Sequence, residues 1–92
     1  MSDLQRCRLT IRRWKPDTAS GLAVADLPPD VATALGGLKQ QRVVGTMNGA
    51  AFASNVMPAG GGRLALSVSK AMMAAAGATV GDEVDVEIGR AV

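Results

Sequence analysis

The sequence contains no histidine, no tyrosine and a single cysteine among its 92 residues. The lack of histidine removes the usual partner of a serine or cysteine nucleophile, the commonest general base near neutral pH and the commonest metal ligand. Because Cys7 has no second cysteine, an intrachain disulfide and a cysteine-based metal site are both excluded. We therefore expect a protein that is not an enzyme and that has no cofactor and no metal.

Long apolar runs and aromatic residues are also scarce. No run approaches the roughly 20 residues that cross a bilayer, and the first residues carry no hydrophobic stretch typical of a secretory signal. Trp14 and Phe52 are the only aromatic residues, so the core must consist mainly of Val, Leu and Met. No linker separates two hydrophobic regions. We expect one cytoplasmic domain over residues 1–92, without membrane contact.

Hydrophobic alternation and turn residues predict the elements. In residues 7–11, Cys7, Leu9 and Ile11 share one face, which is typical of a half-buried strand, and we expect Cys7 to be a buried, inert thiol. Asn48-Gly49 is a strong hairpin signal. We predict strands at 7–11, 22–27, 42–47, 50–57, 63–68 and 83–88, helices at 30–35 and 70–76, and a glycine-rich loop at 58–62.

A faint internal repeat at an offset of 41 residues links the two halves of the chain. It aligns Leu27 with Val68, Val31 with Met72, Gly36 with Gly77 and Val43 with Val84. Two copies are too few for a solenoid, but they suit a closed barrel, which leaves no sheet edge exposed. The predicted fold is mostly β, a small barrel of two pseudo-symmetric halves with two short helices.

One segment resembles a known family. Residues 42–52 read Arg-Val-Val-Gly-Thr-Met-Asn-Gly-Ala-Ala-Phe, and the resemblance extends to the segments 27–31, 57–58, 60–62, 68–70 and 81–84. Together these segments are similar to the bacterial domain-of-unknown-function family 1905 (DUF1905). The resemblance implies a small double-split β-barrel, and it implies no catalytic residue because none is established for the family. The glycines 61–62 and the segment 72–74 depart from the family pattern.

The segment Ser67–Val86 is also similar to half of a dimer of the AbrB/MazE-like transcription factors, which share this fold class. The internal repeat indicates that one chain here already contains both halves. We therefore favour a monomer, with a dimer as the alternative.

A basic N-terminal stretch has two interpretations. It is either a phosphate-contacting stripe or, as we favour, a strand whose Arg6 and Arg8 pair with the acidic face of the last strand, which carries Glu83, Asp85 and Glu87. Even in the second case, three basic residues are expected to stay exposed as candidate nucleic-acid contacts, namely Arg12, Arg13 and Lys15. The lack of aromatic platforms counts against single-strand binding.

Three polar residues lie in loops or at strand ends where a ligand is held in many small barrels. Thr46 lies in the strand before the predicted turn and Asn48 lies in the turn itself, while Arg63 follows the glycine-rich loop, whose backbone N–H groups suit an anion. Each also has a structural interpretation, since Asn and Gly adopt the backbone angles that turns need. We keep Thr46, Asn48 and Arg63 as candidate ligand-binding residues.

These observations favour a non-enzymatic binding or accessory module with a small ligand or a protein as its partner. The alternative is a DNA-binding regulator that uses the basic N-terminal strand. Nucleic acid is the less favoured partner, because we expect Arg6 and Arg8 to pair with the acidic face of the last strand.

Overall fold

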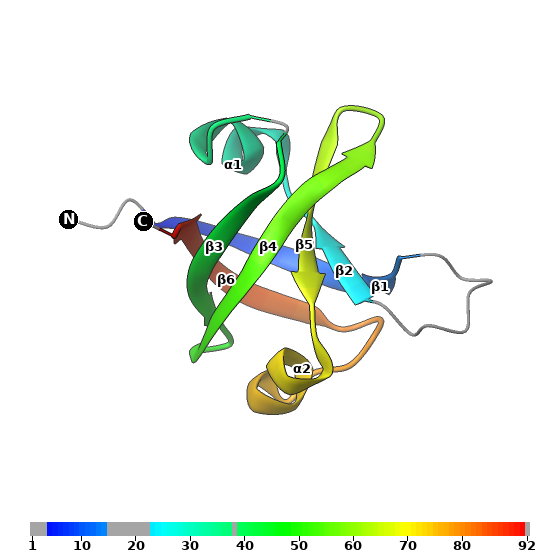
Figure 1. Cartoon of the computed structure of the whole chain (residues 1–92). Helices are drawn as coiled ribbons and strands as arrows, with labels where there is room; N and C mark the ends of the chain where they lie inside the picture. Colours follow the sequence, from blue (N-terminus) through cyan, green and yellow to red (C-terminus); the bar gives the residue numbers. More distant parts are fainter. Residues whose placement is uncertain (1–3, 15–22, 38, 92) are drawn as a thin grey trace.

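Six antiparallel strands form a closed barrel in the computed structural model, which describes residues 4–14, 23–37 and 39–91. The strand order around the barrel is β1-β2-β5-β4-β3-β6, and two short helices lie outside it (Figure 1). The elements are β1 (Gln5–Arg13), β2 (Ala23–Asp26), α1 (Pro29–Ala34), β3 (Gln41–Met47), β4 (Ala50–Gly60), β5 (Arg63–Val68), α2 (Lys70–Ala76) and β6 (Glu83–Arg90).

The predicted two-fold repeat is visible in the strand order. Exchanging β1 with β4, β2 with β5 and β3 with β6 returns the same order around the barrel. The aligned apolar residues are buried in both halves, and Gly36 and Gly77 both have positive φ angles just after a helix. The mostly β fold, a barrel of two related halves with two short helices, is therefore confirmed.

The barrel interior is filled by the apolar face of each strand. Leu9 and Ile11 of β1 and the alternate residues of β6 are buried, as the alternation predicts. Cys7 differs from the prediction, because it is half-buried near the end of its strand rather than fully enclosed. Phe52 is the one aromatic side chain in the core.

Each helix is set by its local sequence and covers part of the barrel. Pro29 opens α1, where its missing N–H costs nothing. Ser69 caps α2 by accepting a hydrogen bond from the backbone N–H of Met72 at 3.1 Å, and Gly77 ends the helix in the left-handed conformation. Among the described residues, no helix is long and apolar enough to span a membrane.

The predicted loop at 58–62 is shorter in the structure, because β4 continues to Gly60. Pro58 pairs with Leu64 of β5, and the register shifts between Pro58 and Gly60. On its other side, β4 pairs with β3 only as far as Val56. Pro58 therefore needs no N–H toward β3, which is why a strand can contain it.

Candidate functional site

A hollow of about 430 Å³ opens on the outer wall of the barrel, where β1, β6 and β3 lie side by side. The strand register aligns three polar side chains in one row across these strands: Arg6 is opposite Glu87, and Glu87 is opposite Thr46. Asp85, Gly49 and Cys7 also line the hollow. The site thus offers a guanidinium, carboxylates and a hydroxyl within one small depression.

The first and last strands do meet through their charged faces, as the favoured interpretation of the N-terminal arginines predicts. Arg8 Nε donates to Asp85 Oδ1 at 3.0 Å, and Arg6 Nη2 lies 3.6 Å from Glu87 Oε1. The Arg6 side chain is 84% exposed, and the Glu87 side chain is 39% exposed. Such exposed pairs contribute about 0–1 kcal/mol to stability. The longer Arg6–Glu87 pair can therefore open for a ligand at little cost.

Asn48 does not line the hollow, although Thr46 and Gly49 on either side of it in the sequence do, and its side chain binds backbone groups. Its Oδ1 accepts the N–H of Asp85 at 2.9 Å, and its Nδ2 donates to the carbonyl of Ala76 at 3.1 Å. Its own N–H donates to the carbonyl of Asp85 at 2.7 Å, which extends the pairing of β3 with β6 by one residue. Asn48 therefore ties the hairpin to β6 and to the end of α2, and one donor and one acceptor of its amide are already used by the backbone.

Arg63 lies apart from the other two candidate residues. It begins β5, beyond the turn at the Gly60 end of β4, whereas Thr46 and Asn48 lie at the Ala50 end. Asp26 of β2 pairs with Ala65 of β5, two residues along the strand from Arg63, so Arg63 lies on the Asp26 side of the barrel. The structure thus brings Thr46 and Asn48 together and places Arg63 at the opposite end of β4.

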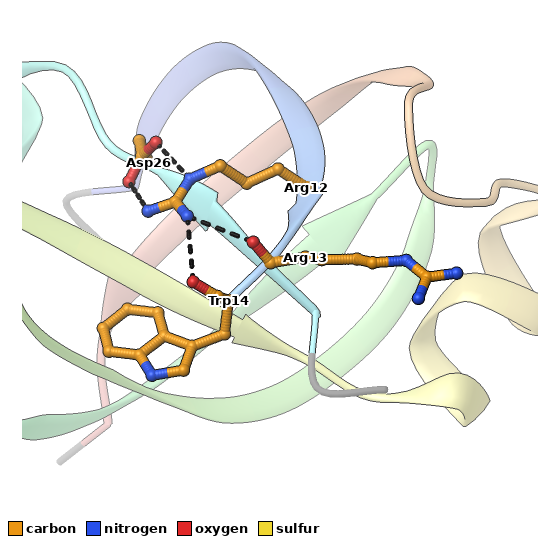
Figure 2. A network of polar contacts seen from close by, with 4 residues as sticks. All are labelled: Arg12, Arg13, Trp14 and Asp26. Atoms are coloured by element: carbon orange, nitrogen blue, oxygen red, sulfur yellow. Dashed lines mark hydrogen bonds and ion pairs between the residues drawn. The ribbon is translucent and has the colours of Figure 1, made fainter. Parts of the chain in front are cut away.

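Arg12 is held in a network at the end of β1, and is half-buried rather than exposed as expected (Figure 2). Its Nε and Nη2 donate to the two carboxylate oxygens of Asp26 at 2.7 and 2.9 Å. Its Nη1 donates to the carbonyls of Arg13 and Trp14, and its Cζ lies 5.9 Å from the centre of the Trp14 ring. The guanidinium therefore has few donors left for a phosphate.

The remaining two candidate nucleic-acid contacts are placed differently. The Arg13 side chain is exposed and extends away from the Arg12 network (Figure 2). Lys15 lies outside the described residues. Of the three candidates, Arg13 alone is seen as a free exposed cation in the described part of the chain.

The Arg12–Asp26 pair predicts a pH-dependent contribution to stability. The hydrogen bonds from Arg12 are the main reason why the pKa of Asp26 lies below its ordinary value. Because this pKa is lower in the folded protein than in the unfolded chain, the ion pair contributes its full stabilisation above the unfolded pKa, which is about 4. This stabilisation is lost as the pH falls through the folded pKa. We expect Asp26→Asn to lower the free energy of unfolding by about 1 kcal/mol at neutral pH, and the difference from the wild type to vanish in acid.

Urea unfolding followed by circular dichroism across that pH range measures this effect. Asp85→Asn is the matched control, since the exposed Arg8–Asp85 pair should contribute less than about 0.5 kcal/mol. A deficit of Asp26→Asn that persists unchanged in acid would contradict the assignment to the ion pair.

Cys7 and the acidic residues offer little for covalent or metal chemistry. Burial, and secondarily the charge of Asp30, raise the pKa of the Cys7 thiol above its ordinary value. The thiol therefore stays protonated at neutral pH, when it is a poor nucleophile. Within the described ranges, no three Cys, Asp or Glu side chains gather as a metal site would require.

Arg6 and Glu87 are the site residues that sequence reasoning did not name as ligand contacts. The sequence did predict that they pair with each other, because opposite charges occur at alternate positions of the first and last strands. The sequence gives no sign that Thr46 continues the same row, because that depends on the register of β3 against β6.

Comparison with known proteins gives one result. No curated protein and no solved structure matches the chain. The model of one family, described as a domain of unknown function, DUF1905, matches residues 9–88. This match covers the barrel from the middle of β1 to near the end of β6. The chain therefore belongs to the DUF1905 family, in agreement with the resemblance seen in its 42–52 segment.

Proposed function

We propose that this protein is a non-enzymatic binding module that takes a small zwitterionic ligand in the hollow between β1, β6 and β3. The observation that carries the proposal is the row Arg6–Glu87–Thr46, in which a cation, an anion and a hydroxyl line one depression. A volume of about 430 Å³ is at the lower end of the range for small-molecule sites.

The chemistry of the row defines the ligand. The guanidinium of Arg6 suits a carboxylate, and the carboxylate of Glu87 suits an ammonium group. The two groups now face each other at 3.6 Å, so a ligand with both charges replaces one loose contact by two. Asp85 is less available, because it already accepts a hydrogen bond from Arg8. Free amino acids are the simplest compounds with this pattern of charges.

A titration followed by backbone amide NMR tests the proposal. The probes are L-glutamate and L-leucine as zwitterions, with acetate and methylammonium as compounds that carry one charge each. We expect saturable shifts of the amides of Thr46, Gly49 and Glu87 with the zwitterions and much smaller shifts with the single charges. Equal responses to all four compounds, or no saturable response, would refute the proposal.

Substitutions locate the binding. Glu87→Gln and Arg6→Gln should each weaken the zwitterion affinity about tenfold, the effect of losing one charge-assisted hydrogen bond. Glu83→Gln is the matched control, because Glu83 is exposed on the same strand but does not line the hollow. If Glu83→Gln weakens binding as much as Glu87→Gln, the loss of affinity reflects the net charge of the protein and not a contact in the hollow.

The alternative of a DNA-binding regulator receives less support from the contacts. Arg6, Arg8 and Arg12 are each paired with a carboxylate, which removes most of the basic stripe that the sequence presents. Duplex binding requires a series of unneutralised cations along the phosphate backbone. A salt titration with random duplex DNA separates the two functions, since micromolar binding at about 50 mM salt that weakens log-linearly would favour the regulator.

A further inference from the structure

The outer face of β3 and β4 is exposed and carries little charge. The strand register pairs its six residues across the two strands, Arg42 with Asn55, Val44 with Ala53 and Thr46 with Ala51, and we call them the β3–β4 face. Val44 at its centre is 40% exposed. The two helices lie at opposite ends of the barrel and leave the middle of both strands uncovered (Figure 1). An apolar side chain is therefore left in water at the middle of a sheet surface.

The internal repeat shows what the barrel requires of this face. Ile11 pairs with Ala25 as Val56 pairs with Leu66, and Ala25 precedes Leu66 by the repeat offset of 41, so β1 corresponds to β4 in register as well as in order. By the same offset β3 corresponds to β6. The surface equivalent to the β3–β4 face is therefore the outer face of β1 and β6, where Arg6 pairs with Glu87, Arg8 with Asp85 and Thr10 with Glu83.

The two equivalent surfaces differ sharply in charge. Five of the six residues are charged on the β1 and β6 surface, whereas Arg42 is the one charged residue of the β3–β4 face. The fold therefore accepts charges at these positions, and the stability of the barrel does not explain why the β3–β4 face is almost uncharged.

Alanine at two successive outward positions of β4 is unfavourable for a sheet surface that only meets water. Ala51 and Ala53 are both exposed, and alanine has a lower strand propensity than threonine or valine. Small side chains do provide a flat surface, on which a second sheet can pack at the usual spacing of about 10 Å. The composition of the β3–β4 face thus suits contact with another sheet.

The charges on and beside this face are balanced about Val44. Arg42 lies two residues before Val44, and Thr46, two residues after it, pairs with Glu87 of β6. A cation thus lies on one side of the centre, and an anion lies equally far along the strand on the other side. The Glu87 carboxylate makes only a loose contact of 3.6 Å with the exposed Arg6, so it can turn toward a new cation.

We infer that the β3–β4 face binds the same face of a second copy of this chain. A two-fold axis that crosses β3 at Val44, at right angles to the strand, places Val44 against the partner's Val44 and Arg42 over the partner's Thr46. The guanidinium of Arg42 then lies beside the partner's Glu87, and the symmetry makes this charge pair twice. A face for an unrelated protein needs no such balance of charges about its centre.

This dimer adds a contact outside the barrel, which the two halves of one chain already complete. Because the face is small, we expect a reversible dimer at micromolar concentration and not an obligate one. Glu87 also belongs to the row proposed to bind a zwitterion. The association is therefore measured without any ligand, so its outcome does not depend on the proposed function.

Sedimentation velocity of the full chain, from low to high micromolar concentration, tests the inference. We expect the sedimentation coefficient to rise with concentration from that of a monomer toward that of a dimer. Raising the salt concentration should weaken the association, because the Arg42–Glu87 pairs lie at the edge of the contact. A monomer at every concentration would overturn the inference.

Two valine substitutions locate the contact. Val44→Asp sets two carboxylates against each other at the axis and should weaken the association at least about tenfold. The fold accepts aspartate there, since Asp85 occupies the equivalent position of the other half. Val80→Asp is the matched control, because Val80 is 39% exposed and lies outside the β3–β4 face, and it should leave the association unchanged. Equal association of the two variants would show that another surface is used.

An exchange of charges tests the two-fold arrangement. Arg42→Glu and Glu87→Arg should each weaken the association about tenfold, and the double variant should restore it. The single variants change the net charge in opposite directions, so a loss in both is not an effect of net charge. Circular dichroism checks that each variant folds, and Val44→Asp decides the matter if one of them does not. A folded double variant that stays monomeric would disprove the arrangement.

Discussion

Gly45→Ala is expected to destabilise the barrel by about 3 kcal/mol or more, through overpacking against backbone that has nowhere to move. A Cβ atom at this position would overlap the carbonyl oxygen of Glu87 and lie 2.8 Å from its carbonyl carbon. Gly45 pairs with Ile88, so the obstacle is the backbone of β6 at the point where β3 and β6 close the barrel. For a domain of this size the loss is a large part of the total stability, about 5–14 kcal/mol.

Thermal unfolding measures this effect, and the midpoint should fall by more than about 10 °C. Gly61→Ala is the matched control, because Gly61 has a φ angle of +62° but nothing within 4 Å of an added Cβ. That variant should lose only about 1 kcal/mol for the left-handed conformation. If the two variants are equally stable, β6 can shift at this point and the close approach is not essential.

Asn48→Ala is expected to lower the free energy of unfolding by about 2–3 kcal/mol, which combines two lost hydrogen bonds with a strained backbone. The side-chain amide binds the N–H of Asp85 and the carbonyl of Ala76, and the residue has a φ angle of +50°. Alanine supplies neither bond and tolerates this conformation poorly. Urea unfolding measures the loss, and faster hydrogen exchange of the Asp85 amide locates it.

Asn48→Gly separates the two contributions. Glycine accepts the positive φ angle but makes no side-chain bond, so it should lose about 1–2 kcal/mol and lie between the wild type and Asn48→Ala. A stable Asn48→Gly variant with unchanged exchange at Asp85 would show that Asn48 acts only as a turn residue. It would also free Asn48 to be reconsidered as a ligand contact.

The contacts of Gln41, Gly45 and Asn48 show how β3 holds neighbouring elements in place. Gln41, its first residue, holds the end of α1, and Asn48, directly after its last residue, holds the end of α2. Gly45 allows its centre to approach β6. The proposed ligand site lies at the Asn48 end of this strand, so it depends on the same contacts.

Much of the fold follows from local pattern. Alternation in the first and last strands, the Asn48-Gly49 turn and the Ser69 cap each depend on neighbouring residues, and all three are found where expected. The pairing of Arg6 and Arg8 with the last strand was also predictable, because opposite charges at alternate positions suit adjacent strands. The length of β4 was not predictable, because a strand can contain Pro58 only beyond the point where β3 stops pairing with it.

The sequence by itself determined that this protein is a small barrel of two related halves, without histidine chemistry or a disulfide, because periodicity and composition act locally. Only the tertiary structure decided which polar groups are free. Arg12 binds Asp26 and the Asn48 side chain binds backbone groups, whereas Thr46 lines the hollow between β1, β6 and β3. Arg6, Glu87 and Thr46 are far apart in sequence, and the register of β6 against β1 and β3 brings them into one row. Register is set by the closure of the whole barrel, which no single segment encodes.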